Sequence, residues 1–172
     1  MMLKLVIPTE EYKEQVLSYK AEFLENGDDM AGTSGLRHAE TFEAWLARDI
    51  SKRSEKTVPE GRVPAWTYLA INEAGRLVGM INVRYRLTPQ LLQYAGNIGY
   101  SIRKCERRKG YATEMLSLAL IEAKKLGLDR VLITCDKSNI ASAKTILKNG
   151  GVLENELRLD DGEIVQRYWI EL

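Results

Sequence analysis

Residues 103–113 read Arg-Lys-Cys-Glu-Arg-Arg-Lys-Gly-Tyr-Ala-Thr, and they join a predicted strand to a predicted helix. Five basic residues and one acidic residue lie within positions 103–109. The whole chain, by contrast, has 25 Lys and Arg against 24 Asp and Glu, a formal net charge of only +1. Basic charge gathered in one segment of a nearly neutral chain favours a local, polyanionic ligand.

The junction between a strand and a following helix is a common phosphate-binding position. The first amides of a helix have no partner within the helix and carry a partial positive charge. Gly110 and Ala112 are small, so the backbone can approach an oxygen to hydrogen-bond distance. The spacing, Arg-x-x-Gly-x-Ala, matches neither the Gly-x-x-x-x-Gly-Lys-Ser/Thr phosphate loop nor the Gly-x-Gly-x-x-Gly dinucleotide fingerprint. The alternative interpretation is an ordinary solvated basic loop.

Apolar periodicity predicts the elements around this turn. A strand at Asn97–Arg103 precedes it and a helix at Gly110–Leu126 follows. The other predicted elements are a strand at Leu3–Ile7, a helix that ends at Asn26, a helix capped by Thr41, a hairpin of Trp66–Ile71 and Leu77–Leu87, a strand at Val131–Cys135, a helix at Ser138–Asn149, and a hairpin of Val152–Leu159 and Ile164–Leu172. We expect Thr88–Gly96 to be a connection, and a single domain over residues 1–172.

Composition limits the classes of function. The 172 residues are 45% hydrophobic and 28% charged, which is typical of a soluble globular domain. Two cysteines, Cys105 and Cys135, are too few for a disulfide framework or a cysteine-rich zinc site, and we expect no metal. No segment reads as a signal peptide or a membrane span, so the expected location is cytoplasmic. The near-zero net charge argues against nucleic-acid and membrane partners.

Together with its neighbours, this turn resembles the GNAT superfamily of acetyl-CoA-dependent N-acetyltransferases. The family pattern Gln/Arg-x-x-Gly-x-Gly/Ala is matched at Arg107, Gly110 and Ala112. It follows Asn-Ile-Gly-Tyr-Ser-Ile at 97–102 and precedes Asn-Ile-Ala-Ser at 139–142. The resemblance covers nearly the whole chain. It implies an α/β (α+β) GNAT fold with a mixed, mostly antiparallel sheet of about seven strands, flanked by about four helices and splayed between the fourth and fifth strands.

The resemblance also implies a site for coenzyme A. The amides of roughly 107–113 would hold its pyrophosphate, and the strand end at Ile102 and Arg103 would pair with the pantetheine arm, as a peptide adds to a free strand edge. Asn139 would meet the pantetheine, although it could simply open the last helix. The expected cofactor-binding residues are Ile102, Arg103, Arg107, Arg108, Lys109, Gly110, Tyr111, Ala112, Thr113 and Asn139.

Two catalytic positions depart from the family pattern. Many relatives carry a Glu base on the fourth strand, where this chain has Asn97, and a Tyr acid seven residues after the helix-opening Asn, where it has Ile146. The base and the acid are therefore unassigned. Tyr100, Asp136 and Tyr168 are possible replacements, each with a simpler interpretation as a strand or turn residue. Direct attack within a ternary complex remains open because positioning alone lowers the barrier.

The predicted activity is acetyl transfer from acetyl-CoA to a primary amine of a small molecule or peptide, by a monomer or homodimer. The acceptor and the acyl-chain preference have no signature in the sequence. The alternative is a coenzyme A-binding sensor that has lost catalysis. His38 as a base and Cys135 as a nucleophile are less favoured than a surface residue and a buried hydrophobe. Trp66 or Trp45 could line the acceptor pocket.

Overall fold

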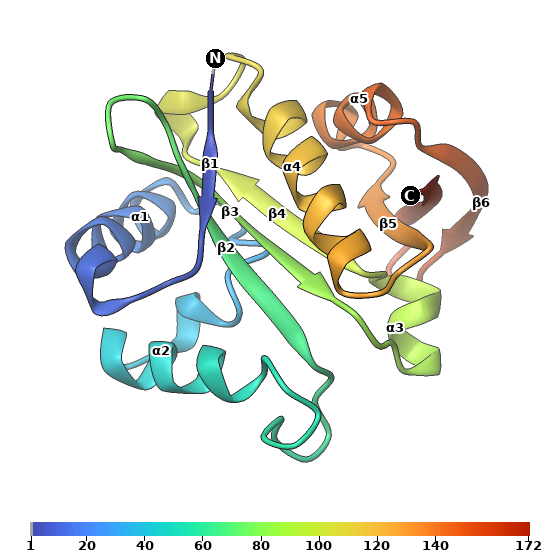
Figure 1. Ribbon diagram of the computed structural model, residues 1–172. Helices are drawn as coiled ribbons and strands as arrows, with labels where there is room; N and C mark the ends of the chain where they lie inside the picture. The colour runs from blue at the N-terminus through green and yellow to red at the C-terminus, as the bar shows by residue number, and fades with distance from the viewer. Residues whose placement is uncertain (1) are drawn as a thin grey trace.

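The computed structural model, which describes residues 2–172, contains two antiparallel sheets (Figure 1). The first has the strand order β1-β2-β3-β4 and the second β5-β7-β6. The strands are β1 (Lys4–Val6), β2 (Ala65–Ile71), β3 (Leu77–Arg84), β4 (Ile98–Ile102), β5 (Arg130–Asp136), β6 (Val152–Arg158) and β7 (Ile164–Glu171). The helices are α1 (Lys13–Asn26), α2 (Phe42–Ser51), α3 (Pro89–Tyr94), α4 (Tyr111–Lys125) and α5 (Ile140–Lys148).

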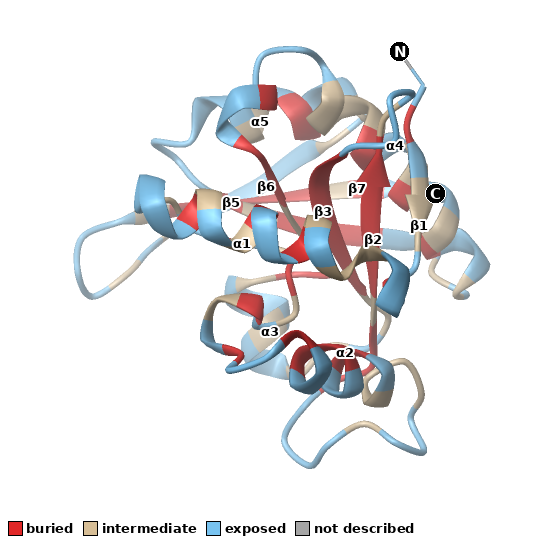
Figure 2. Cartoon of the chain, turned by 90° about the vertical axis from the view of Figure 1, so that its left-hand side faces the viewer, coloured by how far each residue is buried: buried red, intermediate tan, exposed pale blue. Residues whose placement is uncertain are grey.

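Helices cover both faces of the first sheet. On one face, α1 and α2 bury Phe23 and Trp45 against Leu69 and Met80 of the central strands. On the other face, α4 packs into a second apolar cluster that extends to the second sheet. β2 and β3 are therefore almost wholly buried (Figure 2). Each large apolar side chain buried in this way contributes about 1.5–3 kcal/mol to folding.

The ends of the helices follow the expected capping chemistry. Thr41 Oγ1 accepts a hydrogen bond from Ala44 N at 3.1 Å, and α1 ends at Gly27 in the left-handed region (φ 65°). Every helix in residues 2–172 is too short or too polar to span a bilayer.

Two predicted boundaries were wrong. The expected connection at 88–96 contains α3, because Thr88 caps Leu91 N at 3.2 Å and Pro89 occupies the first helical position. This six-residue helix is too short to show an apolar period. The strand expected to reach Leu87 ends at Arg84, where pairing with β4 stops.

The predicted splay between β4 and β5 is confirmed. The two strands belong to different sheets and are linked at the residues just before β4. Asn97 N donates to Leu132 O at 2.7 Å, and Leu132 N donates to Asn97 Oδ1 at 2.8 Å. From this point β4 and β5 diverge, so one edge of β4 is left without a partner strand.

Candidate functional site

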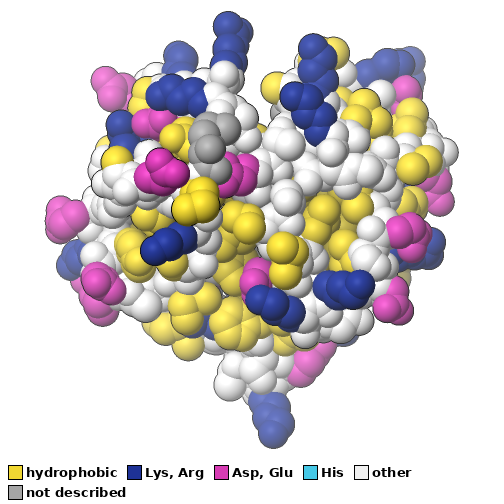
Figure 3. Space-filling model, turned by 45° about the horizontal axis from the view of Figure 1, so that its top comes forward, with side chains coloured by type: hydrophobic (Ala, Val, Ile, Leu, Met, Phe, Trp, Pro, Cys, Tyr) yellow, Lys and Arg dark blue, Asp and Glu magenta, His cyan; other side chains and the backbone are white. Residues whose placement is uncertain are grey.

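A cleft of about 690 Å³ lies along this open edge of β4. Its walls come from the loop after α1, from β4, from residues 106–113 and from the first turns of α5. The space-filling view shows this end of the molecule indented between two groups of Lys and Arg side chains (Figure 3). The basic segment at residues 106–113 therefore forms one wall of this cleft.

The turn that precedes α4 presents unpaired backbone amides to the cleft. Arg108 (φ 62°) and Gly110 (φ 85°) both have left-handed backbone conformations. The first amide of this region with a backbone acceptor is Glu114 N, which donates to Gly110 O at 3.2 Å. Within residues 2–172, the six preceding amides, 108–113, have no protein acceptor. Left-handed residues in such a turn direct successive amides to a common point, an arrangement that can accept an anion.

The edge of β4 offers further backbone donors. Arg84 N donates to Asn97 O and Arg103 N donates to Val78 O, so the odd-numbered residues of this segment bond to β3. Because an antiparallel ladder alternates, the amides of Tyr100 and Ile102 face the gap between β4 and β5. An extended ligand with its own amides can pair there.

The start of α5 closes the opposite side of the cleft. Asn139 is the N-cap residue, and its Oδ1 accepts from Ser142 N at 3.1 Å, which leaves its side-chain NH₂ available to a ligand. The Tyr100 hydroxyl lies 2.9 Å from Ser142 Oγ, across the floor of the cleft. Burial raises the pKa of Tyr100 to about 12, so this phenol is protonated at neutral pH and can donate a hydrogen bond.

The basic side chains of the turn have different roles from one another. Arg107 lines the cleft and donates to Asp28 Oδ2 at 2.8 Å. Lys109 donates to Glu106 at 2.8 Å and Arg103 is buried in an ion pair with Glu22 at 2.8 Å, so both of these side chains lie outside the cleft lining.

The other predicted cofactor-binding residues do line the cleft: Ile102, Arg107, Arg108, Gly110, Tyr111, Ala112, Thr113 and Asn139. Lys144 and Lys148 of α5 also line it, and the sequence interpretation missed them. Their four-residue spacing on a helix opened by Asn139 was the available signal, since such residues share one helix face.

The positions considered for acid–base chemistry are dispersed. The Asn97 side chain accepts from Leu132 N and donates to Arg84 O, so it is occupied in the link between the sheets. Ile146 is 0% exposed in the apolar core, and neither residue lines the cleft. Asp136 and Tyr168 also lie outside the lining, and the Tyr168 hydroxyl donates to Gln166 Oε1 at 2.8 Å. Of the three replacements considered, Tyr100 alone lines the cleft.

The other side chains that the sequence raised as candidates also lie outside the cleft lining. His38 is an exposed residue of a short 3-10 turn, and Cys135 is buried, which raises the pKa of its thiol. Trp45 is 0% exposed and donates its Nε1–H to Thr33 O at 2.8 Å, so it does not line an open acceptor pocket. Trp66 packs against the core, with the guanidinium of Arg53 over its ring.

The loop after α1 covers the opposite face of β4 from α4. Ser101 Oγ donates to Ala31 O at 2.7 Å, and Gly32 sits directly on the backbone of Gly99. A Cβ on Gly32 would lie 2.2 Å from Gly99 O, and its φ of +74° also requires glycine. The loop therefore forms a close cover over the middle of β4.

Three features together define the class of acetyltransferases with the GNAT fold. They are the two diverging sheets, the open edge of β4, and the unpaired amides of residues 108–113, which we call the amide cradle. The chain belongs to this family, because the sequence model of the acetyltransferase (GNAT) domain matches residues 9–152. A comparison with curated proteins finds no match.

Solved structures share the fold at low sequence identity. An acetyltransferase from Salmonella typhimurium that modifies the N-terminal serine of ribosomal protein L7/L12 is 18% identical, with a TM-score of 0.71 over 100% of this chain and 96% of that one. A ribosomal L7/L12 α-N-protein acetyltransferase solved with coenzyme A is 18% identical (TM-score 0.70; 100% and 95% covered). A spermidine N-acetyltransferase chimera from Vibrio cholerae and hSSAT is 14% identical (TM-score 0.69; 99% and 96%).

Proposed function

We propose that this chain is an N-acetyltransferase that moves an acetyl group from acetyl-CoA to a primary amine of a small molecule or peptide. The observation that carries the proposal is the row of six unpaired amides at 108–113, next to the open edge of β4. The amides suit a diphosphate and the strand edge suits the two amides of pantetheine. The ribosomal L7/L12 α-N-protein acetyltransferase of the same fold was solved with coenzyme A bound.

Different residues of the cleft bind different parts of acetyl-CoA. The amides of Gly110 to Thr113 hold the pyrophosphate, and Arg108, Lys144 and Lys148 add positive charge at the mouth of the cleft. The amides of Tyr100 and Ile102 align the pantetheine, and Asn139 contacts it from α5. The thioester then lies toward the closed end of the gap, near Gly99.

The reaction is direct attack in a ternary complex. The neutral amine nitrogen forms a bond to the thioester carbonyl carbon and gives up one of its protons, the carbon–sulfur bond breaks, and the departing sulfur takes up a proton, so that an amide and the coenzyme A thiol result. A backbone amide on the β4 edge can stabilise the negative charge that develops on the carbonyl oxygen. A lysine-like amine must first lose a proton, which costs about 4–5 kcal/mol at pH 7. The Tyr100 hydroxyl, which is protonated at neutral pH, lines the same cleft.

One observation favours a second candidate function, a coenzyme A-binding sensor without catalysis. The positions of the family's usual base and acid hold an amide, Asn97, and a buried apolar residue, Ile146. Such a protein would bind acetyl-CoA through the same cradle and would release no thiol.

Two measurements separate these functions. Calorimetry with acetyl-CoA tests the cradle, and thiol release from acetyl-CoA across a panel of primary amines tests transfer. Binding with amine-dependent thiol release supports the N-acetyltransferase. Binding without release for any amine supports the sensor, and the absence of binding contradicts both.

A further inference from the structure

Two half-buried cations lie under the closed end of the gap between β4 and β5. Arg84 is the last residue of β3, and it projects to the α1/α2 face because Met80 and Asn82, at alternate positions, do so. Lys52 follows α2 and its carbonyl accepts a hydrogen bond from Ala65 N, the residue that pairs with Arg84. We call Lys52 and Arg84 the cation pair.

The cation pair has no carboxylate partner in residues 2–172. Arg84 Nη1 donates to Gly96 O at 3.0 Å and Lys52 Nζ donates to Ser34 Oγ at 3.1 Å. Burial lowers the pKa of both side chains, and for Lys52 the neighbouring Arg62 lowers it further. Asp49 is the carboxylate whose charge acts on the Lys52 pKa, which it raises, and it is already bonded to Arg53 at 3.1 Å.

The two basic residues that are buried outright are paired with carboxylates. Arg103 is 3% exposed and contacts the Glu22 carboxylate at 2.8 Å, while Arg167 contacts Glu154. A buried charge without a counterion is unfavourable, and it is retained where a ligand supplies the opposite charge. In the described part of the chain, Lys20 and Arg37 are also half-buried without a carboxylate partner, and both bond to backbone carbonyls. In the cation pair, burial in addition lowers the pKa of both side chains, so an external anion would stabilise their charged forms.

The free donors of the cation pair are not sealed from solvent. Some side-chain nitrogen and oxygen atoms in residues 2–172 are buried and have no hydrogen-bond partner. They belong to Asp49, Arg53 and Arg167. None belongs to Arg84 or Lys52, so the donors of the cation pair that make no protein hydrogen bond are open to solvent. Arg84 thus has free N–H groups in a fork that fits a carboxylate.

The cation pair also lies next to the reacting position. Arg84 and Asn97 are tied on neighbouring strands, by Arg84 N to Asn97 O at 2.7 Å and by Asn97 Nδ2 to Arg84 O at 2.9 Å. Asn97 marks the closed end of the gap, and Gly99, opposite Asn82, lies two residues farther along β4. Gly32 covers the strand at Gly99, so an acceptor that enters past the closed end of the gap would instead have its near substituents beside Arg84.

We propose that the cation pair of Lys52 and Arg84 binds a carboxylate of the acceptor, so that the preferred substrates are amines carrying a carboxylate a few bonds away, as in amino acids. This inference rests on the proposed N-acetyltransferase function. Arg84 holds the carboxylate by paired hydrogen bonds, and Lys52 adds charge and fixes the loop at Ser34. The amine is then oriented toward the thioester.

The first test compares acceptors on the unaltered protein. Alanine, methionine, serine and glutamate are each assayed beside their α-amides by thiol release from acetyl-CoA. We expect kcat/KM for the acid to exceed that for the amide by about tenfold or more, the usual effect of a charge-assisted hydrogen bond. Amidation lowers the pKa of the neighbouring amine, so more of the amide than of the acid carries a neutral, nucleophilic nitrogen. Amine basicity alone would therefore favour the amide.

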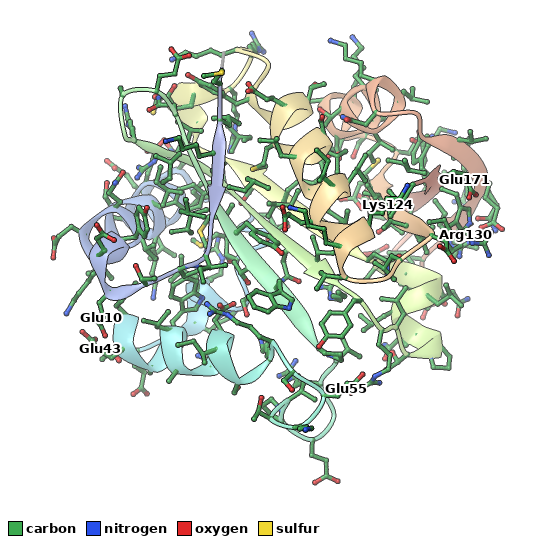
Figure 4. The ribbon with its side chains drawn as sticks, in the orientation of Figure 1. Glu10, Glu43, Glu55, Lys124, Arg130 and Glu171 are labelled. Carbon is green, nitrogen blue, oxygen red and sulfur yellow. The ribbon has the colours of Figure 1, made fainter. Side chains whose placement is uncertain are left out.

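The second test uses variants. Arg84→Met should reduce the acid-to-amide ratio to within about threefold by raising KM for the acid, whereas Arg84→Lys should retain part of the preference. Arg86→Met is the matched control, because Arg86 lies two residues away, is exposed and pairs with Glu55, which Figure 4 shows in the loop after α2. Titration of the coenzyme A-bound protein with the same acids and amides gives a readout that does not depend on turnover.

The outcomes distinguish the two proposals. Equal use and equal binding of acids and amides by the unaltered protein overturns the carboxylate site and leaves the N-acetyltransferase intact. A preference for acids that Arg84→Met and Arg84→Lys both retain in full also overturns it. Failure to bind acetyl-CoA overturns the proposed function, and the carboxylate inference falls with it.

Discussion

Asn97 and Leu132 join the two sheets through a reciprocal pair of hydrogen bonds, one from backbone to backbone and one from backbone to side chain. Asn97 N donates to Leu132 O at 2.7 Å, and Asn97 Oδ1 accepts from Leu132 N at 2.8 Å. The same side chain donates to Arg84 O on β3. The residue at the family's usual base position therefore sets the point where β4 and β5 separate.

Substitution of Asn97 by Ala should destabilise the protein by about 2 kcal/mol or more. The change leaves Leu132 N and Arg84 O buried without the side-chain partner, and each such loss costs about 1–3 kcal/mol. Urea unfolding monitored by circular dichroism measures the effect. An unchanged unfolding midpoint would show that the link is dispensable for stability.

Gly110→Val should weaken acetyl-CoA binding by at least tenfold, about 1.4 kcal/mol, because a branched side chain would enter the space at the amide cradle. Gly127→Val is the matched control at the other end of α4. Its backbone is equally left-handed, with φ of +91° against +85°, and a Cβ there meets no atom within 4 Å. Both variants share the backbone strain, so calorimetry isolates the cradle. Similar affinities in the two variants would contradict the proposed pyrophosphate site.

Arg103→Met should affect stability rather than cofactor binding. The guanidinium is 3% exposed and bonds to the Glu22 carboxylate and to Leu77 O, so its removal leaves a partly buried carboxylate and costs about 3 kcal/mol. Arg86→Met, which breaks an exposed pair, should leave the unfolding midpoint nearly unchanged. A large loss of acetyl-CoA affinity in Arg103→Met, at full folding, would instead return this side chain to the cofactor site.

Tyr100 should make stability depend on alkaline pH. Burial raises the pKa of this phenol from 10.0 to about 12, so the folded protein holds the proton more tightly than the unfolded chain. The resulting stabilisation is complete below pH 10 and is lost as the pH rises toward 12. Tyr100→Phe should therefore lose less stability than the parent between these pH values, as measured by urea unfolding. Parallel losses would show that the phenol titrates normally.

The cradle could be predicted from the sequence because its determinants are local. Gly110 permits a left-handed turn, the apolar period of the following helix is clear, and the amides at a helix start are free by geometry. Thr41 and Gly27 fixed helix ends for the same reason. α3 was missed because its capping residue, Thr88, opens a helix of only six residues.

Side-chain directions and distant pairings could not be predicted in this way. Arg103 and Lys109 belong to the same basic run as Arg107, yet the first two pair with Glu22 and Glu106 and do not line the cleft. The carboxylate that neutralises Arg103 lies on α1, far away in sequence. Lys52 and Arg84 come near each other because Ala65, which bonds to Lys52 O, pairs with Arg84, so their lack of a counterion is visible only in the folded chain.

The contact between Gly32 and Gly99 restricts how this protein could be redesigned. Any side chain at Gly32 would collide with a strand carbonyl, whereas a Cβ at Gly99 would lie 3.4 Å from its closest neighbour, Gly32 N, and could be accommodated by a small shift. To change acceptor selectivity, an engineer can therefore vary the residues on either side of Gly32 in the covering loop, or test Gly99→Ala. Gly32 itself must be kept.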